Sequence, residues 1–168
     1  INNFLFEEQS HVDHQNKIKI LKLEKSFEHT IKIPEVNFPV KIIGIVDRID
    51  EYNGKLRIID YKTGLIQPKQ LKLEDWNLLT KESELRSLFQ ILIYSYVHSD
   101  LISDYDYSAA GIISFRNLKE NFMPLESKIQ KIKTLKHFNF NPFEKILISL
   151  IGEILNPKIS FNSKKEFT

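Results

Sequence analysis

The segment GIVDRIDEYNGKLRIIDYKTG, residues 44–64, combines two apolar, strand-like runs with a central Asn53-Gly54 pair. An Asn-Gly pair between two such runs is the strongest short signal of a β-hairpin, because a type I′ turn needs positive φ at both central residues. The segment therefore predicts strands over 40–51 and 55–62 that are joined by a tight turn.

The register counted outward from this turn gathers charged side chains on one face of the hairpin. Asp47 is expected directly opposite Asp60, and Lys62 shares their face. The same face is expected to carry Ile45, Ile49, Ile58 and Leu56. Two carboxylates about 5 Å apart repel each other by roughly 3 kcal/mol at an effective dielectric of ~20, so something must relieve that cost.

Three forms of relief are open at this point. One carboxyl group is protonated, Lys62 bridges the pair, or a divalent cation lies between the two acids. Oxygen ligands from Asp favour a hard ion such as Mg²⁺ or Mn²⁺. The plain alternative is a solvent-exposed hairpin face with a salt bridge. Arg48 is expected on the other face, in a structural ion pair with Asp50 or Glu51.

Composition limits the class of protein. The chain has 168 residues, of which 42% are hydrophobic, a net charge of +2 and no cysteine. It can therefore form a core, but a disulfide framework, a cysteine zinc site and an iron–sulfur cluster are excluded. No apolar run approaches the roughly 18 residues of a membrane span. The absence of cysteine fits an intracellular, cytoplasmic protein.

The rest of the chain predicts a mixed α/β fold in one domain over residues 1–168. Because the chain begins with Ile, we expect this domain to be part of a longer protein. Ser83 is the predicted cap of the central helix, and Asn141 is the predicted cap of the last one. Helices are predicted over 3–15, 83–99, 125–138 and 141–155, and further strands over 17–33 and 107–115.

The pattern GIVDRID, LRIIDYKTG and FQILIYSY, within residues 40–98, resembles the PD-(D/E)XK nuclease superfamily, and more narrowly the RecB/AddB-type exonuclease domain. The resemblance implies a restriction-endonuclease-like fold, with a mixed β-sheet flanked by helices. It also implies Mg²⁺-dependent cleavage of DNA, with Mn²⁺ as a substitute, often at the end of a helicase–nuclease machine in DNA repair and recombination.

The resemblance implies a role for each motif residue. Asp47 and Asp60 match the metal-binding acids, the Tyr61 carbonyl is a further metal ligand, and Lys62 matches the catalytic lysine. Relatives usually draw one more metal ligand from an upstream helix, for which the candidates here are His11, His14 and Glu24.

Gln90 and Tyr94 match the pair of helical residues that completes the family's motif. Their spacing of four places both on one face of a helix. Two alternatives to a nuclease remain open at this stage. One is a catalytically inert relative that binds DNA or scaffolds a helicase, and the other is a metal-free domain with no nucleic-acid role.

Overall fold

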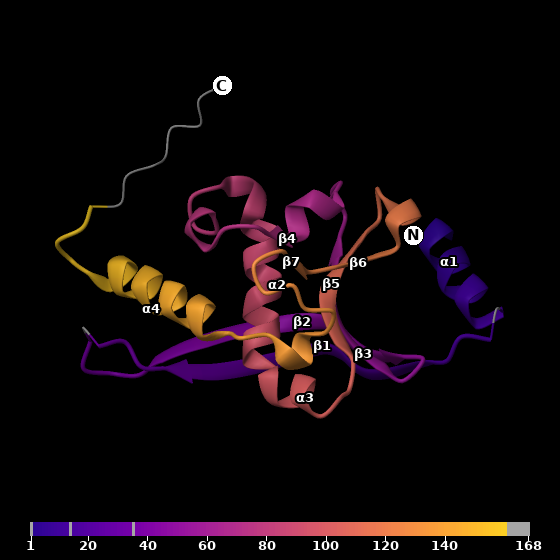
Figure 1. Ribbon diagram of the computed structural model, residues 1–168, viewed down its shortest axis with the longest axis horizontal. Coiled ribbons are helices and arrows are strands. Elements are labelled where there is room, and N and C mark those ends of the chain that lie inside the picture. The colour runs from indigo at the N-terminus through magenta and orange to yellow at the C-terminus, as the bar shows by residue number, and fades with distance from the viewer. Residues whose placement is uncertain (1, 14, 35, 161–168) are drawn as a thin grey trace, which may run out of the picture.

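A computed structural model of the protein describes residues 2–13, 15–34 and 36–160. A five-stranded sheet with the order β1-β2-β3-β5-β6 forms its centre (Figure 1). Its strands are β1 (Ile18–Ile31), β2 (Val40–Tyr52), β3 (Lys55–Lys62), β5 (Ser108–Ser114) and β6 (Phe122–Pro124). A second, two-stranded sheet pairs β4 (Lys72–Leu73) with β7 (Glu126–Ser127).

The large sheet is mixed, because β3 and β5 run parallel while the other neighbours are antiparallel. A parallel pair needs a crossover connection. This one carries α2 (Arg86–Val97) and α3 (Ser99–Ser103), preceded by short 3₁₀ turns at Pro68–Leu71, Trp76–Leu78 and Ser83–Leu85. The predicted α/β fold, with a mixed sheet flanked by helices, is confirmed.

The turn between β2 and β3 has the predicted chemistry. Asn53 and Gly54 have φ values of 50° and 80°, as a type I′ turn requires. Asn53 also ties the chain before β1 to this turn, because its backbone N–H donates to the Lys17 carbonyl and its Oδ1 accepts from the Lys17 N–H. One residue therefore fixes the relative position of three strands.

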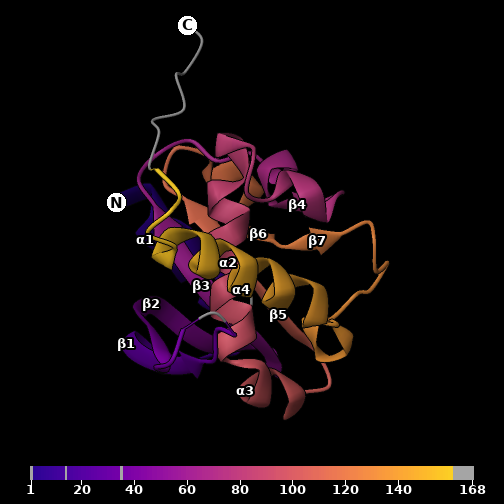
Figure 2. The same ribbon diagram turned by 90° about the vertical axis from the view of Figure 1, so that its left-hand side faces the viewer.

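Helices cover the two faces of the sheet unequally. The buried side of α2, with Leu88, Ile91 and Leu92, belongs to one core with Ile49 and Ile58 of the hairpin. Full burial of each such side chain contributes about 1.5–3 kcal/mol. α4 (Asn141–Leu155) packs on the outside of α2, as Figure 2 shows, with the Phe89 and Phe143 rings 5.6 Å apart.

The opposite face carries α1 (Asn2–Asp13). The Phe4 ring of α1 contacts the rings of Tyr61 and Phe115, at centroid distances of 5.5 and 5.4 Å. Its Glu8 side chain reaches Arg48. Among the described residues, no helix has the length and apolarity that a membrane crossing requires.

Most predicted elements are found, but the helix predicted over 125–138 is wrong. That segment contains β7, a turn with Lys131 at φ 50°, and a 3₁₀ turn over Leu135–His137. Non-local partners override its helical periodicity: β7 pairs with β4, and Thr134 Oγ1 accepts from the Ser108 N–H. The predicted caps are also absent, because α2 starts at Arg86 and the cap position of α4 is Phe140.

Candidate nuclease site

The predicted direct pairing of Asp47 with Asp60 is not found. The ladder between β2 and β3 follows the expected register from Tyr52–Lys55 to Arg48–Ile59 and ends there. Beyond this point the Asp47 Oδ2 atom accepts a hydrogen bond of 2.7 Å from the Tyr61 N–H. The strands thus separate at Asp47, and its carboxylate takes the place of a backbone acceptor.

The expected regular alternation of side chains around Asp47 also needs correction. Ile45 was expected beside Asp47, but its side chain is 55% exposed. Val46 and Ile49 both belong to the core, although residues three apart lie on opposite faces of a regular strand. The alternation of β2 therefore breaks around Asp47. Opposite this point on β1, Glu24 has a φ of 46°, so both strands are irregular at the same level.

Asp60 lies near the end of β3 and is only 3% exposed. Its Oδ1 accepts from the Gln90 Nε2 at 2.8 Å, and its Oδ2 lies 2.8 Å from the Lys62 Nζ. The Lys62 contact has the distance of an ion pair, but Oδ2 has no partner with hydrogen-bond geometry among the described residues. A buried carboxylate oxygen is thus left with unused acceptor capacity.

The amide of Gln90 connects the strand residues to α2. Its Oε1 accepts from Lys62 Nζ at 2.7 Å, while its Nε2 donates to Asp60 and lies 2.6 Å from the Tyr94 hydroxyl oxygen. Gln90 and Tyr94 are one helical turn apart and face the same side, as their spacing predicts. The structure therefore brings Asp60, Lys62, Gln90 and Tyr94 into one connected network.

Burial makes ionisation of this network costly. It raises the pKa of Asp60, with a further upward contribution from the Asp47 charge, and Lys62 opposes both. Burial also raises the pKa of Tyr94, so this hydroxyl group remains protonated at neutral pH. The two acids are accompanied by one lysine, so an additional cation would stabilise the ionised form of Asp60.

Support for Tyr94 comes from two residues that the sequence analysis missed. The Phe27 ring of β1 lies 5.9 Å from the Tyr94 ring and 5.8 Å from the His98 ring. The His98 Nδ1 lies 2.9 Å from the Tyr94 carbonyl oxygen. Gly44 makes room for Phe27, since a Cβ atom at this position would lie 2.7 Å from the Phe27 Cζ. The available signal was the spacing of four from Tyr94 on α2 to His98, the residue that follows this helix.

A second charged cluster lies on the other face of the hairpin. Asp50 is fully buried and accepts two hydrogen bonds from Arg57, of 2.7 and 2.8 Å. Arg48 pairs with Asp50, which confirms one of the two partners predicted for it, and also with Glu8 at 2.9 Å. The Tyr61 side chain points to this cluster, and its hydroxyl oxygen accepts from Arg48 at 3.1 Å.

The donor set on the site face fits a divalent metal. Asp60 Oδ2 is buried with unused acceptor capacity, and Asp47 lies at the adjacent strand separation. In a strand, the N–H and C=O of one residue point to the same side, so the Tyr61 carbonyl is also directed toward Asp47. Carboxylate and carbonyl oxygens suit Mg²⁺ and Mn²⁺.

A further protein ligand is not found in the described part of the chain, where no group of three or more acids or histidines is close enough to hold a metal. Glu24 is exposed, and α1 packs on the opposite face of the sheet. The His11 side chain and His14 lie outside the described structure. The upstream ligand therefore stays a prediction.

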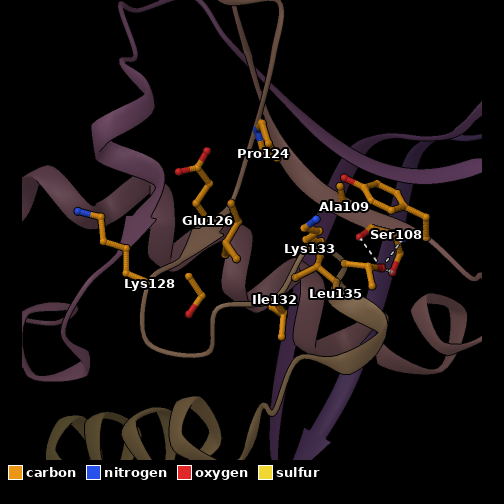
Figure 3. A pocket seen from close by; sticks show the side chains of 12 residues that line it. Ser108, Ala109, Pro124, Glu126, Lys128, Ile132, Lys133 and Leu135 are labelled. Carbon is orange, nitrogen blue, oxygen red and sulfur yellow. Dashed lines mark hydrogen bonds between the residues drawn. The ribbon is translucent and has the colours of Figure 1, made fainter.

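The cavity between the start of β5 and β7 lies away from this network. Figure 3 shows this cavity, which has a volume of about 460 Å³ and where Thr134 bonds to Ser108. None of the predicted site residues lines it. The candidate site is instead built at the surface, where the Lys62 side chain is 30% exposed.

Comparison with known proteins identifies the family. The model of the PD-(D/E)XK nuclease superfamily matches residues 2–166, nearly the whole chain. The chain belongs to this superfamily. The assignment of its D-X-K motif to Asp60, Tyr61 and Lys62 stays a prediction from the sequence. Neither the curated proteins nor the solved structures contain a match to the chain.

Proposed function

We propose that this nuclease domain is a Mg²⁺-dependent deoxyribonuclease of the exonuclease type, with Mn²⁺ as an effective substitute. The PD-(D/E)XK family supports hydrolysis of nucleic acid. The choice of DNA, of a divalent metal and of digestion from an end rests on the resemblance of residues 40–98 to RecB/AddB-type domains.

The observation that carries the proposal is the buried Oδ2 atom of Asp60, which has an ion pair with Lys62 but no hydrogen-bond partner among the described residues. A buried carboxylate with a raised pKa, beside a second acid and only one lysine, is an unfavourable arrangement for stability alone. A bound cation would remove that disadvantage. Asp47, Asp60 and the Tyr61 carbonyl would hold the metal, which supplies Lewis acidity at the scissile phosphate and lowers the pKa of a bound water.

The other residues have roles that follow from their contacts. Lys62 orients the attacking water and stabilises negative charge on the phosphate. Gln90 positions Lys62 and Asp60 through its two amide atoms. Tyr94 holds Gln90 through its hydroxyl group and stays neutral because burial raises its pKa.

The second candidate is an inert relative that binds DNA or scaffolds a helicase. The lack of a third acidic or histidine ligand among the described residues favours it. The complete set of Asp60, Lys62, Gln90 and Tyr94 in mutual contact favours a nuclease, since binding alone does not need a buried acid beside a lysine.

The deciding experiment is digestion of end-labelled linear single- and double-stranded DNA with Mg²⁺ or Mn²⁺. Wild type is compared with Asp60→Ala and Lys62→Ala, and closed circular DNA of the same sequence separates digestion from ends from internal cutting. Metal-dependent loss of linear DNA in the wild type alone is expected.

Absence of cleavage together with a Mn²⁺-induced rise in melting temperature would show a metal site without activity. Absence of both effects would favour the inert domain.

The cellular setting belongs to the same proposal. We place the domain in a longer cytoplasmic protein that acts in DNA repair or recombination together with a helicase domain or subunit. Co-purification of the full-length protein with DNA-stimulated ATPase activity is the expected result, and its absence would leave a free-standing nuclease.

A further inference from the structure

The face of the sheet opposite the nuclease site carries an aromatic pocket. It has a volume of about 310 Å³ and lies at the amino ends of β3 and β5. Its walls include the rings of Tyr52, Tyr107 and Phe122, together with Lys55 and Arg57. We call this group of five residues the aromatic pocket.

Sheet geometry explains why these side chains meet. Lys55 and Arg57 alternate with the core residues Leu56 and Ile58, so they point away from α2. The neighbouring strands align Arg57 with Ala109 and Ile113 with Phe122, which brings Phe122 to the same face. On this face α1 contacts Arg48 and Tyr61, nearer the other end of β3, and not the aromatic pocket.

The aromatic pocket is held in place before any ligand arrives. Arg57 is fixed by its two hydrogen bonds to the buried Asp50. Its guanidinium lies 4.4 Å from the Tyr52 ring centroid and 5.5 Å from that of Phe122. The orientation of both rings is thus stabilised by cation–π contacts, and little side-chain entropy remains to be lost on binding.

Two lysines bring positive charge to the aromatic pocket and its surroundings. Lys55 Nζ lies 4.8 Å from the Tyr107 ring centroid, and Lys133 lines the adjoining cavity shown in Figure 3. The walls of the two cavities share Tyr107, Ala109 and Pro124, so the cavities lie next to each other. Neither lysine has an acidic partner among the described residues, so both are available to an anion.

We propose that the aromatic pocket binds a base of a single-stranded nucleic acid, with the flanking phosphates at Lys55 and Lys133. Aromatic rings that accept stacked bases, beside cations that accept phosphates, are the features by which proteins bind single strands. A duplex hides the faces of its bases and fits the pocket poorly. The pocket lies about 16 Å along β3 from Lys62 and on the other face, so it is a second contact separate from the nuclease site.

Tyr107 offers the sharpest test, because it is 38% exposed and lies outside the core. Affinity for a labelled single-stranded oligonucleotide is measured by fluorescence anisotropy with EDTA, so that no cleavage occurs. Tyr107→Ala removes the ring and should weaken binding roughly ten-fold. Tyr107→Phe keeps the ring and should bind within about two-fold of the wild type.

The charge at Lys55 gives an independent readout. Lys55→Ala should reduce the slope of log affinity against log salt by about 0.7, the value for one phosphate contact on a single strand. Lys145→Ala on α4 also removes one exposed charge and should leave the slope unchanged. A duplex of the same sequence should bind equally well to the wild type and to Tyr107→Ala.

Equal single-strand affinities for the wild type and Tyr107→Ala would overturn the proposal. The result does not depend on the proposed activity, since the aromatic pocket is tested without metal and in the Asp60→Asn background as well. Loss of cleavage in Asp60→Asn with unchanged oligonucleotide affinity would support both proposals separately.

Discussion

The two faces of the β2–β3 hairpin carry charged clusters of similar size but opposite balance. On the face near α1, Arg48 and Arg57 meet Asp50 and Glu8, so two cations face two anions. On the α2 face, the two acids Asp47 and Asp60 are accompanied by one cation, Lys62. The first cluster is balanced in charge, whereas the second has one negative charge in excess.

The difference in charge balance indicates which of the two clusters can take up a cation. Buried charge alone marks neither face, since Asp50 is buried more completely than Asp60. The acids of the two faces differ in their acceptor capacity: Asp50 accepts two hydrogen bonds from Arg57, while Asp60 Oδ2 has only the Lys62 ion pair. A carboxylate with unused acceptor capacity is available to a metal, and one whose acceptor positions are filled stabilises the fold.

The largest difference between the two faces is expected when one acid on each face is neutralised. Asp60→Asn should lower DNA cleavage by about 10³-fold and leave the free energy of unfolding unchanged or raised, because it removes a buried charge whose ionisation is unfavourable. Asp50→Asn should cost about 3–5 kcal/mol of stability, because two arginines lose their buried partner.

Urea unfolding and cleavage per folded molecule measure the two effects. Asp50→Asn should keep cleavage within a few-fold of the wild type at a temperature where it is folded. Equal losses of stability in both variants would mean that the two clusters are alike and that the asymmetry has no functional meaning.

A smaller effect tests whether α2 positions the site. Gln90→Ala removes the amide that joins Lys62, Asp60 and Tyr94, so it should lower the cleavage rate by about 10–10²-fold through loss of orientation. Ser87→Ala, on the same helix, is the matched control and should have little effect. A Gln90→Ala rate equal to that of the control would remove Gln90 from the proposed site.

The smallest expected effect concerns pH and the end of α2. Burial lowers the pKa of His98, and it outweighs the opposing effect of the hydrogen bond to the Tyr94 carbonyl; the charge of Lys25 adds a smaller lowering. The unfolded chain therefore binds more protons as pH falls below 6.5, and the free energy of unfolding decreases until pH has passed the folded pKa. When the pH is lowered from about 7.5 to about 5.5, the range where histidine titrates, the melting temperature of the wild type should fall further than that of His98→Gln. An equal fall in melting temperature for the two proteins would contradict the lowered pKa of His98.

Local signals predicted most of the hairpin and helix positions, and the motif predicted four of the residues that meet. Asn53-Gly54 specified the turn, and the spacing of Gln90 and Tyr94 specified a shared helix face. The irregularity at Asp47 was not predictable, because it depends on β1, where Glu24 departs from strand geometry. The helix predicted over 125–138 was wrong for a related reason, since the partners of this segment, β4 and Ser108, are distant in sequence.

The tight turn at Asn53 has a consequence for the order in which the parts of the sheet fold. A hairpin of this kind forms in roughly 1–10 μs from local contacts, whereas the parallel pairing of β3 with β5 must wait for the whole crossover to close. Asp47 and Asp60 are thus brought together early, before α2 carries Gln90 into place. A cation present at that moment would favour the docking of α2, so we expect refolding in Mg²⁺ or Mn²⁺ to be faster for the wild type than for Asp60→Asn.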